Sequence, residues 1–304
     1  MSEKVFAARN LTKQYKGLHA LDGLDMEINR GDIYGFIGEN GAGKTTLIRI
    51  LGGLASPTRG EISLFGVGKA ARLPGQRRRI GGIVESPAAH PGLSAAENLE
   101  VFRLQRGIPG KDCIVRMLET VGLAEAGKQQ VKHFSLGMKQ RLGLAAALLG
   151  DPEFLVLDEP ANGLDPVGIV EFRETIKRLN RENGITILIS SHVLAELYQI
   201  ATCYGFICKG KMVEQITADQ LDEKCEKHLR IRVDHTPAAV AVLETALHTR
   251  KYEVFPDHIR LYDFLDESGV VSNALFAGGI TIEEITARGD NLEGYYMSLM
   301  RGRK

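Results

Sequence analysis

The sequence lacks the features that would place the chain inside a membrane or on a secretory route. No apolar run approaches the roughly 18–20 residues that a membrane-spanning helix requires. The opening residues, Met1 to Lys4, are not followed by the apolar segment of a signal peptide. We therefore expect that any work at a membrane is done through a partner.

Cysteine is scarce, and its spacing excludes the common thiolate sites. The four cysteines, Cys113, Cys203, Cys208 and Cys225, form no C-x-x-C pair. This pattern is not that of a zinc site or of a disulfide framework. We interpret the four side chains as reduced, mostly structural thiols of a cytosolic protein.

An excess of charge of either sign is also missing. The chain of 304 residues has 38 Lys+Arg and 38 Asp+Glu, so its formal net charge is zero. A protein that binds polyanions in general carries a basic excess, and the overall balance gives no support for one here. We therefore expect no nucleic-acid partner.

The first 217 residues are predicted to form an α/β domain. The continuous apolar runs at 154–157 and 186–189 are typical of parallel strands covered on both faces. The pattern becomes helical between about 87 and 150, and the S-x-x-E sequence at 94–97 predicts a capping box. Further strands are predicted at 5–8, 24–28, 61–65 and 80–84, helices at 167–181 and 193–200, and a hairpin turn at 208–211.

Residues 218–304 are predicted to form a second, smaller α+β domain. The order of its elements is β-α-β-β-α-β, which is typical of a ferredoxin-like two-layer fold. A last amphipathic helix is expected at 292–300. The strands are expected at 229–233, 252–255, 258–262 and 280–286, and the helices between them at 237–248 and 267–276.

One loop carries the strongest functional signal. Residues 38–45 match G-x-x-x-x-G-K-[ST], between a strand-like apolar run at 33–37 and a helical pattern from 46. In such a loop successive backbone N–H groups cradle a polyphosphate, the lysine lies near the β and γ phosphates, and the hydroxyl reaches Mg²⁺. The sequence predicts nucleoside triphosphate binding by Gly38, Glu39, Asn40, Gly41, Ala42, Gly43, Lys44, Thr45 and Thr46.

An apolar run that ends in two carboxylates supplies the partner of this loop. Asp158 and Glu159 follow directly after 154–157. We expect Asp158 to hold Mg²⁺ through water, opposite Thr45, and Glu159 to polarise an attacking water near the γ-phosphate. For this segment taken alone, a solvated acidic turn is the alternative.

A third motif identifies a family resemblance. Residues 134–141 open a helix rich in Leu and Ala, with Ser135 placed as its N-cap. The segment resembles the signature sequence of ABC transporter ATPases, in which it closes over the γ-phosphate of ATP held by a second copy. The resemblance implies this role for Ser135 and Gly137. Phe134, Leu136 and Met138 replace the family's more usual Leu, Gly and Gln.

Other segments follow the order of the same family from residue 5 to about 215. Residues 162–165 resemble the D-loop at the dimer interface, and residues 190–192 resemble the switch-histidine segment. Tyr15 stands where the family carries an aromatic residue that stacks on adenine. The resemblance implies a P-loop ABC ATPase domain at 1–217 with a helical subdomain at about 87–150. It also implies ATP and Mg²⁺ as cofactors, nucleotide contacts by Tyr15 and Asp165, and catalytic roles for Lys44, Glu159 and His192.

One position departs from the family pattern. Glu85 occupies a place where most members have a glutamine that senses Mg²⁺ and borders the groove for the membrane subunit. We therefore predict that Glu85 joins Thr45 and Asp158 at the metal. With this glutamate and the sequences at 135–141 and 291–299, the chain resembles the ATPases of bacterial exporters that protect cells from lantibiotics, bacitracin and similar peptides. A tolerated substitution without specific meaning is the alternative.

The resemblance implies the ATPase subunit of such an exporter. Two copies would sandwich two ATP molecules and drive a separate integral membrane permease from the cytoplasmic face of the cell membrane. One alternative is the ATPase of another ABC transporter, either an importer or an exporter of lipids, ions or drugs. A second is a soluble ABC protein acting on ribosomes or DNA, but the chain has one set of motifs and no heptad run.

Overall fold

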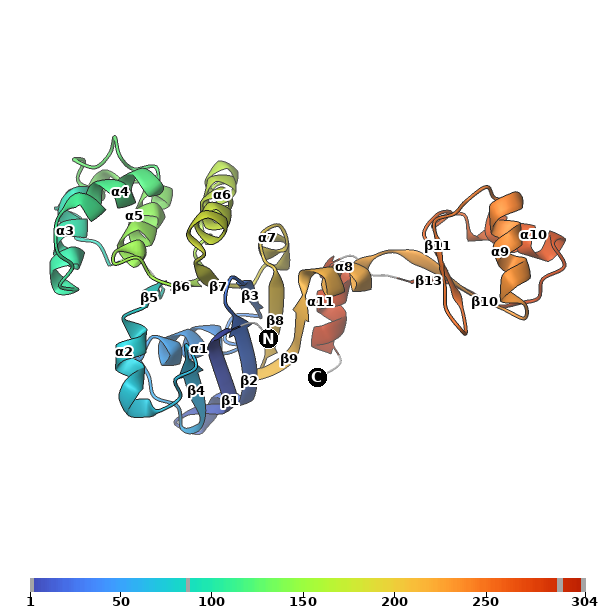
Figure 1. Cartoon of the computed structure of the whole chain (residues 1–304), viewed down its shortest axis with the longest axis horizontal. Coiled ribbons are helices and arrows are strands. Elements are labelled where there is room, and N and C mark those ends of the chain that lie inside the picture. The colour runs from blue at the N-terminus through green and yellow to red at the C-terminus, as the bar shows by residue number, and fades with distance from the viewer. Residues whose placement is uncertain (1–2, 86–87, 289–291, 302–304) are drawn as a thin grey trace. The chain divides into compact units, whose positions relative to one another are not determined.

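The computed structural model describes residues 3–85, 88–288 and 292–301. The chain divides into two compact units, Met1–Ala218 and Asp219–Lys304. Each unit has its own hydrophobic core and combines helices with a sheet (Figure 1). Within the described residues, no helix has the length and apolarity needed to cross a membrane.

A six-stranded sheet forms the centre of the first unit. Its strand order is β5-β6-β7-β3-β8-β9, with β9 antiparallel to β8 and the other neighbouring pairs parallel. All residues of β3, β6 and β7 are buried, which agrees with their continuous apolar sequences. The strands are β3 (Ile33–Ile37), β5 (Ile80–Ile83), β6 (Phe154–Asp158), β7 (Thr186–Ser191), β8 (Cys203–Cys208) and β9 (Lys211–Thr217).

A second, antiparallel sheet of the first unit has the order β2-β1-β4. Its strands are β1 (Lys4–Tyr15), β2 (Leu18–Asn29) and β4 (Arg59–Leu64). One core cluster contains Phe6 and Leu24 of this sheet, Leu47 and Ile48 of α1 (Lys44–Leu51) and Val156 of β6. Helix α1 therefore packs within the core shared by the two sheets.

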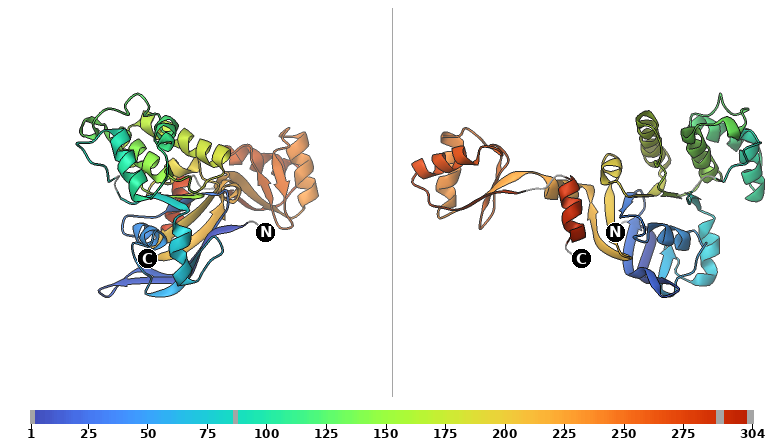
Figure 2. Two further views of the ribbon diagram at one scale, coloured as in Figure 1. Left: turned by 60° about the vertical axis from the view of Figure 1, so that its left-hand side comes forward. Right: turned by 180° about the vertical axis from the view of Figure 1, so that it is seen from behind.

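Helices α3, α4, α5 and α6 cover the opposite side of the six-stranded sheet, whereas Leu73 of α2 belongs to the same core cluster as α1. Figures 1 and 2 show α3, α4, α5 and α6 on one side of it and β1, β2 and β4 on the other. The predicted capping box is confirmed, because Ser94 and Glu97 each bond the other's backbone N–H. The helices are α2 (Leu73–Arg77), α3 (Ala95–Gln105), α4 (Asp112–Thr120), α5 (Leu136–Leu148), α6 (Pro166–Asn183) and α7 (Leu194–Tyr198).

The second unit contains one antiparallel sheet with the strand order β11-β12-β10-β13. Leu229 and Ile231 of the sheet share a core with Leu243 of α9 and Leu275 of α10. The two helices therefore cover one face of the sheet. The elements are α8 (Ala218–Cys225), β10 (His228–Val233), α9 (Thr236–Thr245), β11 (Tyr252–Val254), β12 (Ile259–Leu261), α10 (Ser268–Ala277), β13 (Ile282–Arg288) and α11 (Leu292–Arg301).

Most helices and strands lie where the sequence patterns predict them, but some differ in length from the prediction. The strands predicted at 5–8 and 24–28 are too short, because β1 and β2 form a hairpin of two 12-residue strands. Register shifts in this hairpin break the two-residue alternation on which the prediction at 24–28 relied. The hairpin turn at 208–211 is confirmed by the pairing of β8 with β9. Residues 86–87 and 289–291, which include the start of the segment at 291–299, lie outside the described residues.

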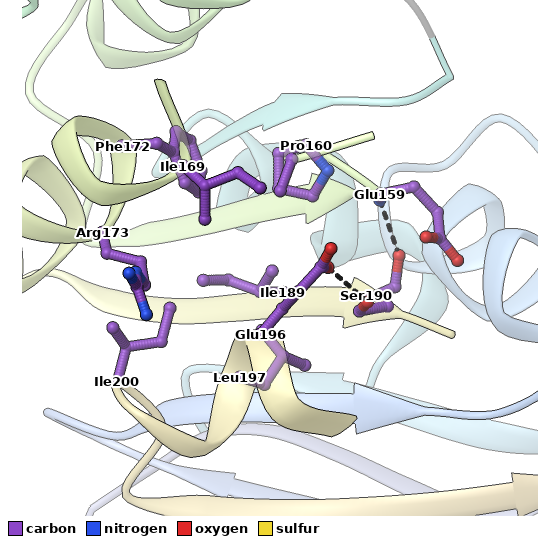
Figure 3. A pocket seen from close by; sticks show the side chains of 12 residues that line it. Glu159, Pro160, Ile169, Phe172, Arg173, Ile189, Ser190, Glu196, Leu197 and Ile200 are labelled. Atoms are coloured by element: carbon purple, nitrogen blue, oxygen red, sulfur yellow. Dashed lines mark hydrogen bonds between the residues drawn. The ribbon is translucent and has the colours of Figure 1, made fainter. Parts of the chain in front are cut away.

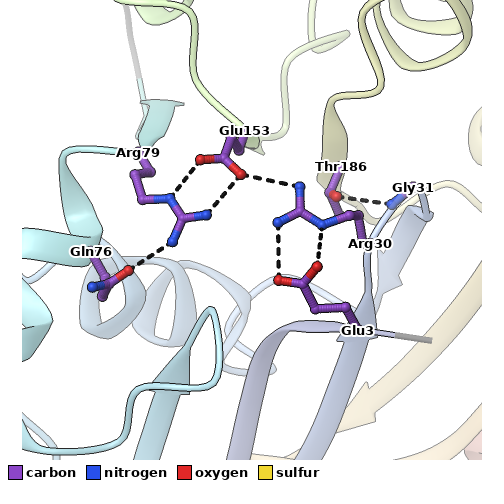
Figure 4. Close-up of polar contacts among 7 residues, drawn as sticks. All are labelled: Glu3, Arg30, Gly31, Gln76, Arg79, Glu153 and Thr186. Atoms are coloured by element: carbon purple, nitrogen blue, oxygen red, sulfur yellow. Dashed lines mark hydrogen bonds and ion pairs between the residues drawn. The ribbon is translucent and has the colours of Figure 1, made fainter. Parts of the chain in front are cut away.

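Ion pairs connect four segments of the first unit at the end of the sheet where β6 and β7 begin (Figure 4). Glu153 accepts hydrogen bonds from Arg79 at 2.6 and 2.8 Å and from Arg30 at 3.1 Å. Arg30 also donates to Glu3 at 2.8 and 3.1 Å. The guanidinium of Arg79, and then that of Arg30, lowers the pKa of the Glu153 carboxyl.

We predict that Glu153→Gln lowers the free energy of unfolding by up to about 1 kcal/mol at pH 7, because the pairs are partly solvated. The pKa of Glu153 is lowered from an ordinary value of 4.5, so this contribution is complete above that pH and is lost as the pH falls through the folded-state pKa. Urea unfolding of both proteins at pH 7 and pH 3.5 measures the difference. A difference that grows on acidification would contradict the assignment.

A glycine lets β5 approach α5 closely. A Cβ atom at Gly81 would lie 2.1 Å from the carbonyl oxygen of Ala147 and 2.9 Å from its carbon. Because this neighbour is backbone, it cannot move aside as the end of a side chain can. Position 81 therefore requires glycine. It lies in β5, the strand that precedes Glu85, the predicted metal ligand.

We predict that Gly81→Ala lowers the free energy of unfolding by about 1–3 kcal/mol, since overpacking forces the backbone of β5 and α5 apart. Gly75→Ala is the matched control, because a Cβ at Gly75 has no heavy atom within 4 Å. Thermal and urea unfolding compare both variants with the parent protein. Equal stability of the two variants would show that the close approach has no energetic consequence.

Candidate functional site

The predicted site residues gather where parallel strands end. The carboxyl ends of β3, β6 and β7 lie at one edge of the sheet, where ligands of open α/β sheets bind. The loop after β3 leads into α1, Asp158 ends β6 with Glu159 after it, and His192 follows β7. Adjacent pairing of these strands places the three segments side by side.

Glycines shape the loop between β3 and α1. Gly43 has φ +114°, and a Cβ there would lie 2.4 Å from the carbonyl oxygen of Ala20. A Cβ at Gly38 would lie 2.5 Å from the carbonyl oxygen of Ile207. The loop therefore packs against the neighbouring backbone in a conformation that a larger residue could not adopt. Gly38, Ala42, Gly43 and Lys44 are buried, Thr45 and Thr46 are half-buried, and Glu39, Asn40 and Gly41 are exposed.

Lys44 is a buried cation at the centre of the site. Its side chain is 5% exposed, and its Nζ donates to the carbonyl oxygens of Gly38 at 2.6 Å and Glu39 at 3.2 Å. The same Nζ lies 3.1 Å from Oε1 of Glu159. A buried ammonium requires such partners, because an unpaired charge is costly to remove from water.

Asp158 links the phosphate loop to the end of β6. Its Oδ2 accepts a hydrogen bond of 2.8 Å from Oγ1 of Thr45, and the residue is 3% exposed. A hydroxyl and a carboxylate oxygen at this distance are suitable ligands for Mg²⁺, which binds one or two protein oxygens together with phosphate oxygens and water. The donor set therefore fits the predicted metal, with Thr45 and Asp158 as the residues that would hold it.

Glu159 stands in an unusual backbone conformation with φ +47° (Figure 3). A left-handed conformation is uncommon for a residue other than glycine and costs on the order of 1 kcal/mol or more. Its carboxylate contacts Lys44 through Oε1 and His192 through Oε2. Oε1 is buried and, apart from its ion pair with Lys44, has no polar partner among the described residues. That oxygen retains a lone pair with which it can accept a proton.

His192 reaches the same carboxylate from β7. Its Nδ1 lies 2.8 Å from Oε2 of Glu159, and its side chain is 39% exposed. Contact through Nδ1 leaves the Nε2 atom of the ring free of this interaction. The structure therefore brings together five predicted residues: Lys44, Thr45, Asp158, Glu159 and His192.

Ser190, two residues before His192, was not predicted as a site residue but joins this group. Its Oγ donates to Oδ1 of Asp158 at 2.6 Å and accepts the backbone N–H of Glu159 at 2.9 Å. The residue is completely buried. A serine at the end of an otherwise apolar strand is the only sequence signal for this position.

The structure does not bring every predicted residue to the same place. Ser135 is the N-cap of α5, as predicted, and accepts the N–H of Met138 at 3.2 Å. Asp165 is the N-cap of α6 and accepts the N–H of Gly168 at 3.0 Å. In the described part of the chain, no hydrogen bond or ion pair connects Ser135, Gly137 or Asp165 with the phosphate loop.

Two further predicted residues lie at the margins of the site. Tyr15, at the end of β1, is 42% exposed, and the Nζ of Lys13 lies 4.8 Å from the centre of its ring. The carboxylate of Glu85 forms an ion pair with Arg49 of α1, and its backbone has φ +66°. The carboxylate of Glu85 is therefore paired with a cation, and its role at the metal stays a prediction.

Comparison with known proteins identifies relatives over the whole chain. The sequence model for "ABC transporter" matches residues 21–162. Bacitracin transport ATP-binding protein BcrA of Bacillus licheniformis is 44% identical over 299 residues, which cover 98% of this chain and 98% of the relative. Lantibiotic transport ATP-binding protein SrtF of Streptococcus pyogenes is 45% identical over 205 residues, covering 67% of this chain and 87% of the relative.

A solved structure agrees with this likeness. The dimeric structure of MJ0796, a bacterial ABC transporter cassette, has a TM-score of 0.63 and 25% identity and covers 70% of this chain and 98% of that chain. The likeness to BcrA, by contrast, extends over 98% of both chains and thus into the second unit. The chain therefore belongs to the ATP-binding proteins of ABC transporters: it binds ATP and is an ATPase.

Proposed function

We propose that this protein hydrolyses ATP to drive the export of a bacitracin-like or lantibiotic-like peptide antibiotic through a membrane permease. The observation that carries the ATPase part is the meeting of Lys44, Asp158, Glu159 and His192 at one edge of the sheet. The whole-length similarity to a bacitracin transport protein supports the class of substrate.

The phosphate loop and Lys44 bind the polyphosphate. Backbone N–H groups at the start of α1 and the helix dipole attract the phosphate oxygens. The Nζ of Lys44 lies between two loop carbonyls and Glu159, so it can turn to a phosphate oxygen while it keeps an anionic partner. Thr45 and Asp158 would hold Mg²⁺, which would supply charge neutralisation at the phosphates.

Glu159 is the proposed general base. Its buried Oε1 accepts a proton from the attacking water, and its contacts with Lys44 and His192 orient the carboxylate. His192 is the proposed contact to the γ-phosphate on the opposite side of that carboxylate. The side chain of Glu159 thus takes up the proton that a positioned water loses as it attacks the phosphate.

A second copy of the chain completes each site in this proposal. Ser135 and Gly137 stand at the N-terminus of the 13-residue helix α5, whose exposed backbone N–H groups and dipole favour an anion. Because no hydrogen bond or ion pair of the described residues connects them with the phosphate loop of their own chain, we propose that they bind the nucleotide of the partner copy, with Asp165 beside them. The dimeric state of MJ0796 supports this arrangement.

The proposed permease contact lies beside Glu85. A hollow of about 210 Å³ is lined mostly by apolar residues of β5, α3 and α5, among them Phe102 and Leu142, together with Val84 after β5 and Arg106 after α3. Val84 directly precedes Glu85, so a permease segment in this hollow would touch the strand end that leads toward the nucleotide. Such a contact would hold the protein at the cytoplasmic face of the cell membrane, where we propose that it works.

For the second unit we propose a ferredoxin-like fold. The elements follow the order β-α-β-β-α-β from β10 to β13, and β10 lies between β12 and β13 in an antiparallel sheet. In this arrangement each helix connects two strands that are separated by a third, as in a split β-α-β unit.

We predict that Glu159→Gln lowers kcat for ATP hydrolysis by about 100-fold or more, because the amide cannot accept the proton of water. ATP binding should be retained, and ATP should drive a stable dimer that gel filtration with light scattering detects. Glu119→Gln is the control, since Glu119 is exposed on α4 and outside the site. A kcat equal to that of the parent would remove Glu159 from the role of general base.

The transport proposal has its own test in cells. We predict that this protein, expressed with its permease in a susceptible bacterium, raises the minimal inhibitory concentration of bacitracin or a lantibiotic at least about fourfold. Lys44→Ala should abolish the increase, because a buried ammonium next to the phosphates is lost. An antibiotic with an intracellular target serves as the control compound. Resistance that is unchanged by the wild-type pair would contradict the proposed substrate class.

A further inference from the structure

Ser190 occupies the place where β6 and β7 cease to pair. It is the residue opposite Asp158 in the parallel register, and no further pair of these strands follows. Beyond this point the backbone of Glu159 turns to φ +47° and leaves the sheet. A side-chain hydroxyl here can replace the hydrogen bonds that strand pairing no longer supplies.

The hydroxyl of Ser190 uses both its donor and its acceptor. It donates to Oδ1 of Asp158 at 2.6 Å and accepts the N–H of Glu159 at 2.9 Å. Asp158 directs its other oxygen, Oδ2, to Thr45 at 2.8 Å. One buried hydroxyl therefore contacts both acidic residues of the site, through the carboxylate of the first and the backbone of the second.

The neighbouring serine makes different contacts. Ser191 donates to Oε2 of Glu196 at 3.0 Å and accepts the N–H of Val193 at 3.0 Å. Successive side chains of a strand point to opposite faces, so only Ser190 can reach β6 in this way. The interaction with the acidic pair is thus specific to one of the two serines.

We propose that Ser190 is a positioning residue of the ATPase site: its hydroxyl holds Oδ2 of Asp158 toward Thr45 and holds Glu159 in its left-handed turn. The proposal rests on the ATPase function proposed above and adds a residue that does not touch the reacting atoms. Without the hydroxyl, Oδ1 of Asp158 loses a donor and the N–H of Glu159 loses its acceptor. Both carboxylates would then sample orientations away from Thr45 and Lys44.

The test compares the wild-type chain with Ser190→Ala. We expect kcat to fall by about 10- to 100-fold, as is typical when a group that orients a catalytic or metal-binding residue is removed. The KM for ATP should change by less than about threefold, since the phosphate loop is untouched. The Mg²⁺ concentration for half-maximal activity should rise, because Asp158 is no longer held toward Thr45.

A second readout needs neither nucleotide nor metal. Hydrogen exchange followed by mass spectrometry reports on the backbone amide of Glu159. In the wild-type protein this N–H donates a hydrogen bond to Oγ of Ser190. We expect faster exchange of the peptide containing Glu159 in Ser190→Ala. Unchanged exchange would show that the hydroxyl does not hold this backbone segment.

Two comparisons separate positioning from stability. The threonine of Ser190→Thr and the valine of Ser190→Val have nearly the same shape, but only threonine keeps a hydroxyl. We therefore expect a higher kcat for Ser190→Thr than for Ser190→Val. Thr186→Val is the matched control on the same strand, because Thr186 is also fully buried and accepts the N–H of Gly31 at 3.0 Å, far from the site. It should lower the melting temperature but leave kcat and the Mg²⁺ dependence unchanged.

The outcomes are distinguishable. Equal kcat and Mg²⁺ dependence for Ser190→Val and Ser190→Thr would overturn the positioning role while the ATPase function stands. Should Ser190→Ala fail to fold, this isosteric pair still isolates the hydroxyl. Absence of ATPase activity from the wild-type chain with its permease would instead contradict the proposed function itself.

Discussion

Parallel pairing of β3, β6 and β7 is the constraint on which the rest of the structure depends. The pairing places a loop, two carboxylates and a histidine at one edge of the sheet, although Thr45 and Asp158 are 113 residues apart in sequence. All residues of the three strands are buried, so a shift in register would expose apolar side chains or bury polar ones. The core that stabilises the sheet therefore also sets the distances within the site.

The charges at this edge are arranged so that none is isolated. Lys44 is nearly inaccessible, yet it has two carbonyl oxygens and Glu159 as partners. Glu159 in turn contacts His192, and Asp158 accepts from Thr45 and Ser190. A phosphate group carries the same sign of charge as Glu159, so Lys44 can exchange one partner for the other without becoming an unpaired buried charge. The arrangement therefore favours reversible binding of an anion.

Much of the fold could be predicted, for reasons that particular segments illustrate. The apolar runs at 154–157 and 186–189 are long enough to identify β6 and β7, and Ser94 with Glu97 predicts a cap that depends only on neighbouring residues. The full length of the β1–β2 hairpin could not be predicted, because its irregular register interrupts the alternation of buried and exposed residues. In the site, Lys44, Asp158 and Glu159 followed from motifs. Ser190 did not, because its role depends on the residue that faces it across the sheet.

The sequence by itself determined the chemistry of this protein: a phosphate loop, an acidic pair and a signature segment act through local backbone geometry and residue type. Tertiary structure alone decided which of these groups meet. It joined His192 to Glu159 and Ser190 to Asp158, paired Glu85 with Arg49, and placed Ser135 and Asp165 as the N-caps of α5 and α6. The physical reason is that contacts between distant segments depend on strand order and register, which no local pattern encodes.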